Sequence, residues 1–178
     1  VLLAAMQMIK NKNIKLDVYS STQVYGDAFK EANDDKWVPL YKQASELPNV
    51  NYIGYRPNQF ILDNLQNYHI FAYPSIWEET SCISAIECMS AGLYSIVTNY
   101  GALYETCSEF PIYVQYLQDY KLLAKSFATA IDIAADTLHL DVIQSNLDMQ
   151  QEFYKRFYSW EKQADTWSNF LRGVTNVK

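Results

Sequence analysis

The sequence predicts an α/β fold: a doubly wound, Rossmann-like parallel sheet with helices on both faces. Short runs of high β propensity alternate with longer segments of helical spacing along the chain, and this order is typical of βαβ units. The short runs are largely apolar, as expected for parallel strands that are covered on both faces. We expect about five strands, with ligands bound at the carboxyl ends of the strands as in other folds of this class.

The first half of the chain alternates helix and strand. A helix is expected over Val1–Lys12 and a strand over Ile14–Ser20. Tyr25-Gly26-Asp27 is a turn signal, and Asp35–Leu47 is expected to be a helix with one apolar face made by Trp37, Leu40, Tyr41 and Ala44. The next expected elements are a strand at Val50–Ile53, a helix at Asn58–Asn67 that starts at Pro57, and a strand at Ile70–Tyr73 that Pro74 ends.

The second half continues the alternation and ends in helices. Ser84–Ala91 is expected to be helical, with Gly92 as its C-cap. The remaining expected elements are strands at Tyr94–Thr98 and Ile112–Tyr116 and helices at Tyr120–Ala135, Leu138–Phe157 and Ser159–Leu171. We therefore predict a Rossmann-like domain over residues 1–158 and a separate C-terminal helix over residues 159–178.

Charge and composition narrow the function classes. The net charge of −6 disfavours nucleic acid as a partner, because an acidic surface repels phosphate backbones. A small anionic ligand can still bind at a helix N-terminus. The three cysteines, Cys82, Cys88 and Cys107, form no CxxC pair and are expected to be reduced thiols. No apolar run approaches the roughly 20 residues that span a membrane.

The opening run VLLAAMQMIKNKN resembles the middle of an amphipathic helix, without a preceding cap or an initiator Met. We therefore expect this chain to be a piece of a longer protein.

Two glutamates flank the helix start expected after the third strand. Backbone N–H groups at such a start favour an anion such as pyrophosphate. Glu79 precedes the turn, and Glu87, eight residues later, is expected on the same helix face. Carboxylates accept hydrogen bonds from hydroxyls, so a nucleotide sugar, with hydroxyls on both sides of a diphosphate, would fit. Alternatively, Glu78, Glu79 and Glu87 are ordinary solvated charges, and spacing alone leaves both interpretations open.

The motifs decide between these interpretations in combination. Pro74–Ser75 ends a strand, Glu79 follows, and seven residues separate it from Glu87–Gly92 (ECMSAG). Downstream come Thr98–Glu105 (TNYGALYE) and Tyr158–Trp160 (YSW). In this order they resemble the motifs of the retaining glycosyltransferases of the group 1 (family 4) type, relatives of glycogen and sucrose synthases. The resemblance covers nearly the whole chain and implies the C-terminal, donor-binding half of a GT-B fold.

The resemblance implies roles for the residues around the turn. Glu79 would hydrogen-bond hydroxyls of the donor sugar, and Glu87 would bind the ribose hydroxyls. Glu78 lies one position too far from Glu87 for the motif. The backbone N–H groups of the turn, which has lost the family's glycines, would meet the sugar and the diphosphate through Thr80, Ser81, Cys82 and Ile83.

Other loops supply the remaining implied contacts. Gly54, Tyr55 and Arg56 correspond to the nucleotide-base loop, where Tyr55 would stack on the base or serve as a packing aromatic, and Arg56 would meet a phosphate or remain a loop charge. Ser20 belongs to the loop after the first strand, and Gly101 would shape the pocket wall. The Arg and Lys with which family members offset the leaving diphosphate have no counterpart in this chain, so its catalytic apparatus is expected to be incomplete.

The implied activity is transfer of a sugar from a nucleotide diphosphate donor to an unidentified acceptor, with retention at the anomeric carbon. Glu79 would orient the sugar and stabilise positive charge. No metal or other cofactor is expected, and the plausible donor loops lack an Asp-x-Asp pair. The donor supply implies the cytoplasm, with peripheral membrane contact through the missing half as a further expectation.

Three alternatives remain open. A nucleotide-sugar epimerase of the same fold would need a catalytic carboxylate or histidine set in the cleft, and no cleft loop contains a histidine. A non-catalytic nucleotide-binding or scaffold module is compatible with the altered turn. The third interpretation is that the chain binds donor without catalysing transfer. If an N-terminal domain is absent, aromatic residues of the last helices should be exposed and favour self-association.

Overall fold

A computed structural model describes residues 1–175, and within them five strands form only parallel pairs. β1 (Leu16–Val18) pairs with β2 (Val50–Tyr52). β3 (Ile70–Tyr73), β4 (Tyr94–Thr98) and β5 (Ile112–Val114) pair in that order in a second sheet. The predicted α/β fold with parallel strands is confirmed, although within residues 1–175 no strand of one sheet pairs with a strand of the other.

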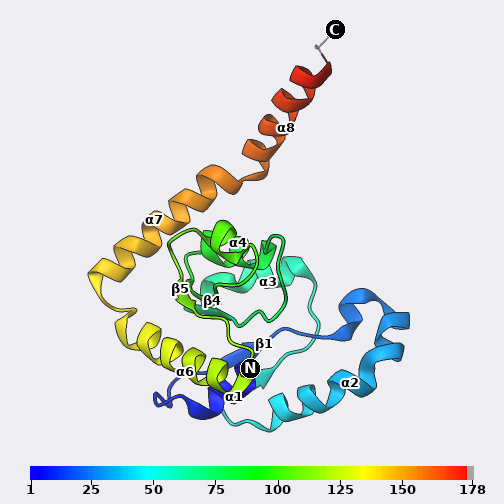
Figure 1. The fold of residues 1–178 in the computed structure, drawn as a ribbon, viewed down its shortest axis with the longest axis vertical. Coiled ribbons are helices and arrows are strands. Elements are labelled where there is room, and N and C mark those ends of the chain that lie inside the picture. Colours follow the sequence, from blue (N-terminus) through cyan, green and yellow to red (C-terminus); the bar gives the residue numbers. More distant parts are fainter. Residues whose placement is uncertain (176–178) are drawn as a thin grey trace.

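Helices connect successive strands and continue beyond β5 (Figure 1). The α-helices and the two 3-10 helices, η1 and η2, are α1 (Leu2–Met8), η1 (Thr22–Tyr25), α2 (Asp27–Glu46), α3 (Asn58–Asn64), η2 (Leu65–Asn67), α4 (Ile83–Ser90), α5 (Leu103–Cys107), α6 (Tyr120–Thr137), α7 (Asp141–Tyr158) and α8 (Trp160–Thr175).

Both faces of the second sheet are covered, and the side chains of β4 show which helices cover them. Successive side chains of a strand point to opposite faces. Ile96 is fully buried in a cluster that includes Phe127 of α6, whereas Val97 is fully buried in another cluster with Met89 of α4. α4 and α6 accordingly lie on opposite sides of this sheet (Figure 1).

Two helix predictions were wrong in part, and one helix was not predicted. α2 begins at Asp27 rather than Asp35, because the polar start of this helix shows no apolar periodicity in the sequence. Of its predicted apolar face only Ala44 is buried. α1 ends at Met8, where the chain turns extended and Asp132 of α6 accepts backbone hydrogen bonds from the next residues. α5 was not predicted, since five residues are too few to show a helical period.

The last two helices differ in their packing. α7 contacts the body: Gln150 donates to the carbonyl of Met89 in α4 and to that of Leu93 before β4. The Tyr154 hydroxyl donates to the carbonyl of Thr106. α8 has no buried residue among those described and extends away from the sheets (Figure 1). The division at residue 158 stays a prediction, and residues 176–178 of the predicted helix lie outside the described residues. Within residues 1–175 no helix is both long and apolar enough to cross a membrane.

The three cysteines are free and buried. Burial raises the pKa of the Cys88 thiol and that of the Cys107 thiol from 9.0 to about 12. Because the thiolate is the reactive form, we expect these thiols to react with Ellman's reagent at pH 8 roughly a hundredfold more slowly than a free thiol, and rapidly in urea. Stopped-flow absorbance measures this. Full reaction of the native chain at the rate of free cysteine would contradict the burial of both residues.

Candidate functional site

A hollow of about 440 Å³ opens beside the carboxyl ends of two strands. Ser20, after β1, and Pro74, after β3, contribute to its wall. Asn58 at the start of α3 and Glu87 of α4 contribute the opposite side chains. Part of the hollow therefore lies where ligands of doubly wound sheets bind.

Glu87 is half-buried on α4 and contacts the start of α3. The Asn58 amide nitrogen donates to Glu87 Oε1 at 3.2 Å. A carboxylate has about four lone-pair sites, so the amide leaves Glu87 free to accept bonds from hydroxyls of a ligand. Asn58 was not predicted, because an Asn after Pro57 is an ordinary helix-start residue and nothing in its spacing indicates Glu87 as its partner.

Glu79 lies in the loop before α4, so the expectation that it shares a helix face with Glu87 is wrong. The Tyr73 hydroxyl, at the end of β3, donates to Glu79 Oε1 at 2.5 Å. Burial, and after it this hydrogen bond, raises the pKa of Tyr73, so the phenol remains a neutral donor. Tyr73 also lines the hollow. It therefore links Glu79 to the wall that holds Glu87, and it too was not predicted.

The loop that contains Glu79 is fixed to the end of β4. The buried Thr98 hydroxyl donates to the carbonyl of Ser75 at 2.8 Å, and the Ala102 N–H donates to the carbonyl of Glu79 at 2.7 Å. Gly101 has φ 59°, and a Cβ at this position would lie 2.5 Å from the Glu79 nitrogen. A glycine is therefore required for this close approach of two backbones.

The start of α4 has free backbone donors. Cys82 is the N-cap, and no side-chain hydrogen bond caps the helix. The first N–H groups of an α-helix have no partner within the helix, so they are available to an anion. Thr80, Ser81 and Ile83 are exposed beside them, whereas the Cys82 side chain is buried in the core. Any contact of Cys82 with a ligand would therefore involve its backbone.

The predicted base loop follows β2 and is exposed. Gly54 has φ 74° and its N–H donates to the carbonyl of Val18 at 3.3 Å, which holds the loop against β1. Tyr55 is exposed. Arg56 donates to the carbonyl of Tyr55 at 2.7 Å and lies over the Phe60 ring, so its guanidinium contacts its own loop and α3.

The structure gathers only part of the predicted set. Ser20 and Glu87 line the hollow, and Glu79 reaches its wall through Tyr73. The other predicted residues lie outside the lining and keep their ligand roles as predictions: Gly54, Tyr55, Arg56, Thr80, Ser81, Cys82, Ile83 and Gly101. Among residues 1–175 no group of three or more His, Cys, Asp or Glu side chains is placed to hold a metal ion.

The sequence that contains this site matches the model of a known protein family. A model of the family described as glycosyl transferases group 1 matches residues 1–136, from α1 into α6. The chain belongs to this family. The match includes Glu79, Glu87 and Gly101, so the residues that surround the hollow are part of the group 1 domain. A comparison with curated proteins finds no match.

Solved structures resemble this group 1 chain in fold. A glycosyltransferase from Rickettsia africae has a TM-score of 0.75 at 16% identity over 99% of this chain and 44% of its own. Sucrose-phosphate synthase from Thermosynechococcus elongatus has 0.73 at 20% identity, over 99% and 42%. Anabaena HepE, in complex with UDP-glucose, has 0.66 at 18% identity, over 94% and 44%.

The TM-scores establish a shared fold, and the predicted GT-B resemblance is confirmed. The chain spans less than half the length of these structural neighbours. Activity, substrates and partners of the whole protein are therefore matters of proposal.

Proposed function

We propose that this domain is the donor-binding half of a retaining glycosyltransferase that takes a nucleotide diphosphate sugar. One observation carries the proposal: two carboxylates, Glu79 and Glu87, flank the uncapped start of α4 beside a hollow at the carboxyl ends of β1 and β3. A diphosphate suits the free N–H groups, and the hydroxyls of a sugar and a ribose suit the carboxylates. HepE with UDP-glucose has a similar fold, which is consistent with this donor class.

The two glutamates bind different parts of the donor. Glu87, held by Asn58, accepts from the ribose hydroxyls. Glu79, held by Tyr73, accepts from hydroxyls of the transferred sugar and stabilises the positive charge that develops on it during transfer. Tyr55 stacks on the base. The N–H groups of Thr80 to Ile83 meet the diphosphate and the sugar, and Gly101 keeps Glu79 in place.

Transfer then proceeds with retention by front-face attack, in which the departing phosphate accepts the proton of the acceptor hydroxyl. Neither glutamate acts as a covalent nucleophile in this scheme. The donor loops bind the diphosphate without a metal, through backbone N–H groups and the helix dipole. The acceptor remains open. The site of action is the cytoplasm, where nucleotide sugars are supplied, with peripheral membrane contact through the other half of the protein.

The ribose assignment is tested by Glu87→Ala in the intact protein. A hydrogen bond to a charged group contributes about 1.5–3 kcal/mol, so we expect roughly 10- to 100-fold weaker binding of UDP, or of whichever nucleoside diphosphate binds best. The affinity for inorganic pyrophosphate, which has no ribose, should fall by less than about twofold. Isothermal titration calorimetry measures both ligands.

Glu78→Ala is the matched control for that experiment, because it removes the same charge from an exposed residue of the neighbouring loop. It should leave both affinities unchanged. Equal losses for UDP and pyrophosphate in Glu87→Ala would remove Glu87 from the ribose site. In a thermal-shift screen of UDP-, GDP- and ADP-sugars, at least one should raise Tm. If none does, the scaffold interpretation replaces the enzyme.

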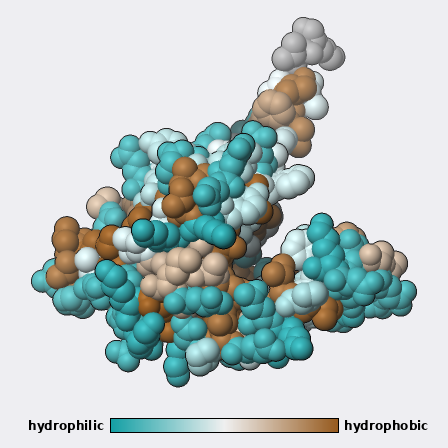
Figure 2. Space-filling model, turned by 60° about the horizontal axis from the view of Figure 1, so that its bottom comes forward, coloured by the Kyte–Doolittle hydropathy of each residue, from teal (hydrophilic) through white to brown (hydrophobic). Residues whose placement is uncertain are grey.

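Self-association through α8 follows from its exposed apolar face. Trp160 is 89% exposed, and Trp167, Phe170, Leu171 and Val174 are all more than half exposed. These residues recur at helical spacing and make one side of α8. Figure 2 shows apolar surface on this helix next to the grey C-terminal residues. An apolar stripe of this kind favours contact with another surface.

We therefore expect the 178-residue chain to form dimers or larger species at micromolar concentration. Trp167→Glu should raise the dissociation constant of the dimer roughly tenfold or more, because a charge within a buried apolar contact is strongly unfavourable. Asn169→Glu, on the opposite side of the same helix, should leave association unchanged. Sedimentation velocity distinguishes these outcomes. A wild-type chain that is monomeric at all concentrations would contradict the role of α8.

A further inference from the structure

Trp77 is the aromatic residue of the loop that holds Glu79, and its side chain is 77% exposed. Such exposure is unusual for an indole, because removing so large an apolar surface from water is favourable. Within residues 1–175 neither an aromatic ring nor a cation is stacked on the Trp77 ring, whereas the Lys36 ammonium lies over the ring of Trp37. The Trp77 ring is therefore free to contact a ligand.

The backbone that carries Trp77 is fixed to the end of β4. The hydroxyl of the buried Ser75 accepts from the Trp77 N–H at 3.3 Å and donates to the Trp77 carbonyl at 3.0 Å. The Ser75 carbonyl accepts in turn from Thr98, and two residues after Trp77 the carbonyl of Glu79 accepts from Ala102. An aromatic side chain on a fixed backbone loses little conformational freedom when it binds a ligand, so Trp77 is suited to be a rigid contact.

Apolar and polar side chains are mixed around this ring. The exposed residues of the loop and of the first position of α4 are Ile76, Trp77, Glu78, Thr80, Ser81 and Ile83. The apolar residues of α8, in contrast, make one continuous side of that helix, as a protein partner requires. An aromatic ring among polar groups suits a ligand that is itself amphipathic. A sugar ring is such a ligand, because it has faces of C–H groups and a rim of hydroxyls.

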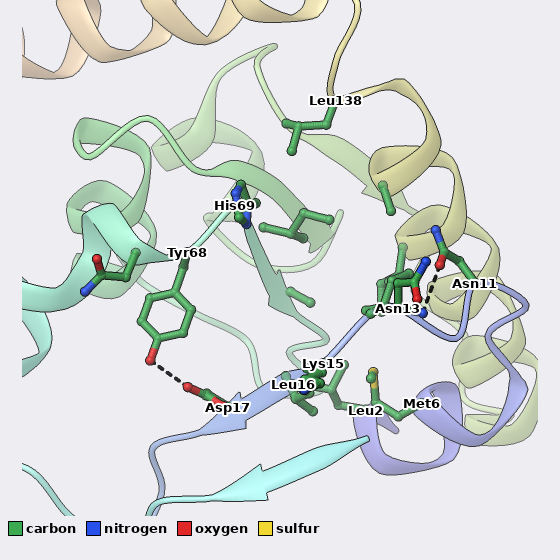
Figure 3. A pocket seen from close by; sticks show the side chains of 16 residues that line it. Leu2, Met6, Asn11, Asn13, Lys15, Leu16, Asp17, Tyr68, His69 and Leu138 are labelled. Carbon is green, nitrogen blue, oxygen red and sulfur yellow. Dashed lines mark hydrogen bonds between the residues drawn. The ribbon is translucent and has the colours of Figure 1, made fainter. Parts of the chain in front are cut away.

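The larger of the two hollows, of about 570 Å³, lies toward the opposite end of the strands. Figure 3 shows Lys15 and Leu16 at the start of β1 and Tyr68 and His69 just before β3 among its lining residues. These are the amino ends of parallel strands, whereas ligands of doubly wound sheets bind at the carboxyl ends. Trp77 follows the carboxyl end of β3 and is therefore on the side where a substrate is expected.

We propose that the acceptor of sugar transfer is a neutral carbohydrate and that Trp77 is the surface on which its sugar ring stacks. The inference rests on the proposed function, in which Glu79 binds the transferred sugar. Two residues span at most about 7 Å of chain, so a ring on Trp77 would lie next to a sugar held by Glu79. The C–H face of the acceptor contacts the electron-rich face of the indole. Residues 74–83 contain two glutamates and no Lys or Arg, so an anionic acceptor would be repelled.

This position of the acceptor satisfies the chemistry of transfer. The acceptor hydroxyl oxygen forms the new bond to the anomeric carbon of the donor sugar, and the bond from that carbon to the diphosphate oxygen breaks. The departing phosphate takes the hydroxyl proton. Stacking fixes one face of the acceptor and leaves its hydroxyls at the rim, so that one of them can reach the anomeric carbon. Trp77 thus positions the acceptor and takes no part in the proton transfer.

Nuclear magnetic resonance of the intact protein tests the stacking without a donor. The indole N–H signal of Trp77, assigned with Trp77→Phe, should shift on titration with at least one of methyl β-glucoside, methyl β-galactoside and methyl α-mannoside. The signals of Trp37 and Trp160, which are also exposed, are the comparison and should stay in place. Glucuronate should need roughly tenfold higher concentration for the same shift, because it is repelled. A Trp77 signal that none of these glycosides moves, or that glucuronate moves equally well, would overturn the proposal.

Turnover by the intact protein separates the acceptor from the donor. With the donor found in the thermal-shift screen, Trp77→Ala should lower kcat/KM for the best of these glycosides roughly tenfold or more, because the stacked contact is lost. Hydrolysis of the same donor by water needs no stacked acceptor, so its rate and the Kd of UDP should change by less than about twofold. Trp77→Phe, which keeps an aromatic face, should recover most of the loss, whereas Trp77→Leu should not.

Two results would overturn the role of Trp77. Equal losses in transfer and hydrolysis would make it a structural or donor residue, and a fully active Trp77→Leu would show a general apolar contact with another part of the protein. Failure of the proposed function gives a different result. A wild-type protein that binds no nucleotide, but whose Trp77 signal still responds to the neutral glycosides, would contradict donor binding and support a sugar site at Trp77.

Discussion

Glu79→Gln in the intact protein is expected to lower kcat by about 100- to 1000-fold, which is the usual cost of removing one charge-stabilising group from an active site. The Kd of a nucleoside diphosphate should change by less than about threefold, since the proposed contacts of Glu79 are to the transferred sugar. Steady-state kinetics with the donor found in the thermal-shift screen, together with calorimetry of the nucleotide, separates the two effects.

The substitution isolates charge from shape. A glutamine side chain is isosteric with that of Glu79, and its amide oxygen can still accept the hydrogen bond that Tyr73 donates to Glu79 Oε1. Tyr73→Phe performs the reverse change, because it keeps the carboxylate and removes the group that holds it. We expect Tyr73→Phe to lower kcat roughly tenfold, which is less than for Glu79→Gln, because the carboxylate remains but is less well positioned.

Glu78→Gln is the control for charge, since Glu78 is exposed in the same loop. It should alter kcat by less than about twofold, because surface substitutions away from a site have small effects. If Glu79→Gln turned over sugar at the wild-type rate, Glu79 would have no part in transfer, and its bond with Tyr73 would be a structural contact of the loop.

The strongest sequence predictions concern elements with clear local signals. β3 and β4 have the predicted boundaries, because each is an apolar run beside a residue that interrupts regular secondary structure. These residues are Pro74 after β3 and Gly92 before β4. Gly92 ends α4 with φ 86° as a left-handed cap. The α/β class follows from the same alternation. Local sequence was sufficient wherever a boundary depends on one residue's backbone preference.

Contacts between distant segments were beyond local sequence. The bond between Asn58 and Glu87 and the bond between Tyr73 and Glu79 depend on how helices and loops meet after folding. The division of the strands into two sheets depends on which strands pair, and a list of strands does not contain that information. Glu79 and Glu87 were found because the motif names them. Their partners carried no such signal.

Gly101→Ala should be the most destabilising substitution near the site. A Cβ there would lie 2.5 Å from the nitrogen and 2.7 Å from the oxygen of Glu79, and both are backbone atoms. Backbone cannot move aside as a flexible side chain can. Overpacking costs about 1–3 kcal/mol, and a non-glycine residue at φ 59° costs about 1–2 kcal/mol more. We expect Tm of the intact protein to fall by roughly 5–15 °C.

Gly26→Ala is the matched control, because it separates backbone strain from contact. Gly26 has φ 90°, and a Cβ there would meet no atom within 4 Å. Its substitution should therefore cost only the strain of an unfavourable backbone conformation, about 1–3 kcal/mol. It lies before α2 and does not line the hollow of the candidate site. Differential scanning calorimetry of both variants, side by side, measures the two losses.

The two variants should also differ in function. The Ala102 N–H holds the carbonyl of Glu79 across the same contact that Gly101 permits. An added methyl at Gly101 would therefore displace Glu79 together with its loop, and a displacement of about 1 Å can cost a hundredfold in rate. Molecules of Gly101→Ala that remain folded should thus turn over sugar slowly, whereas folded Gly26→Ala should be as active as wild type. If Gly101→Ala lost stability but kept full activity per folded molecule, the close approach would serve only the fold, and Glu79 would not depend on it.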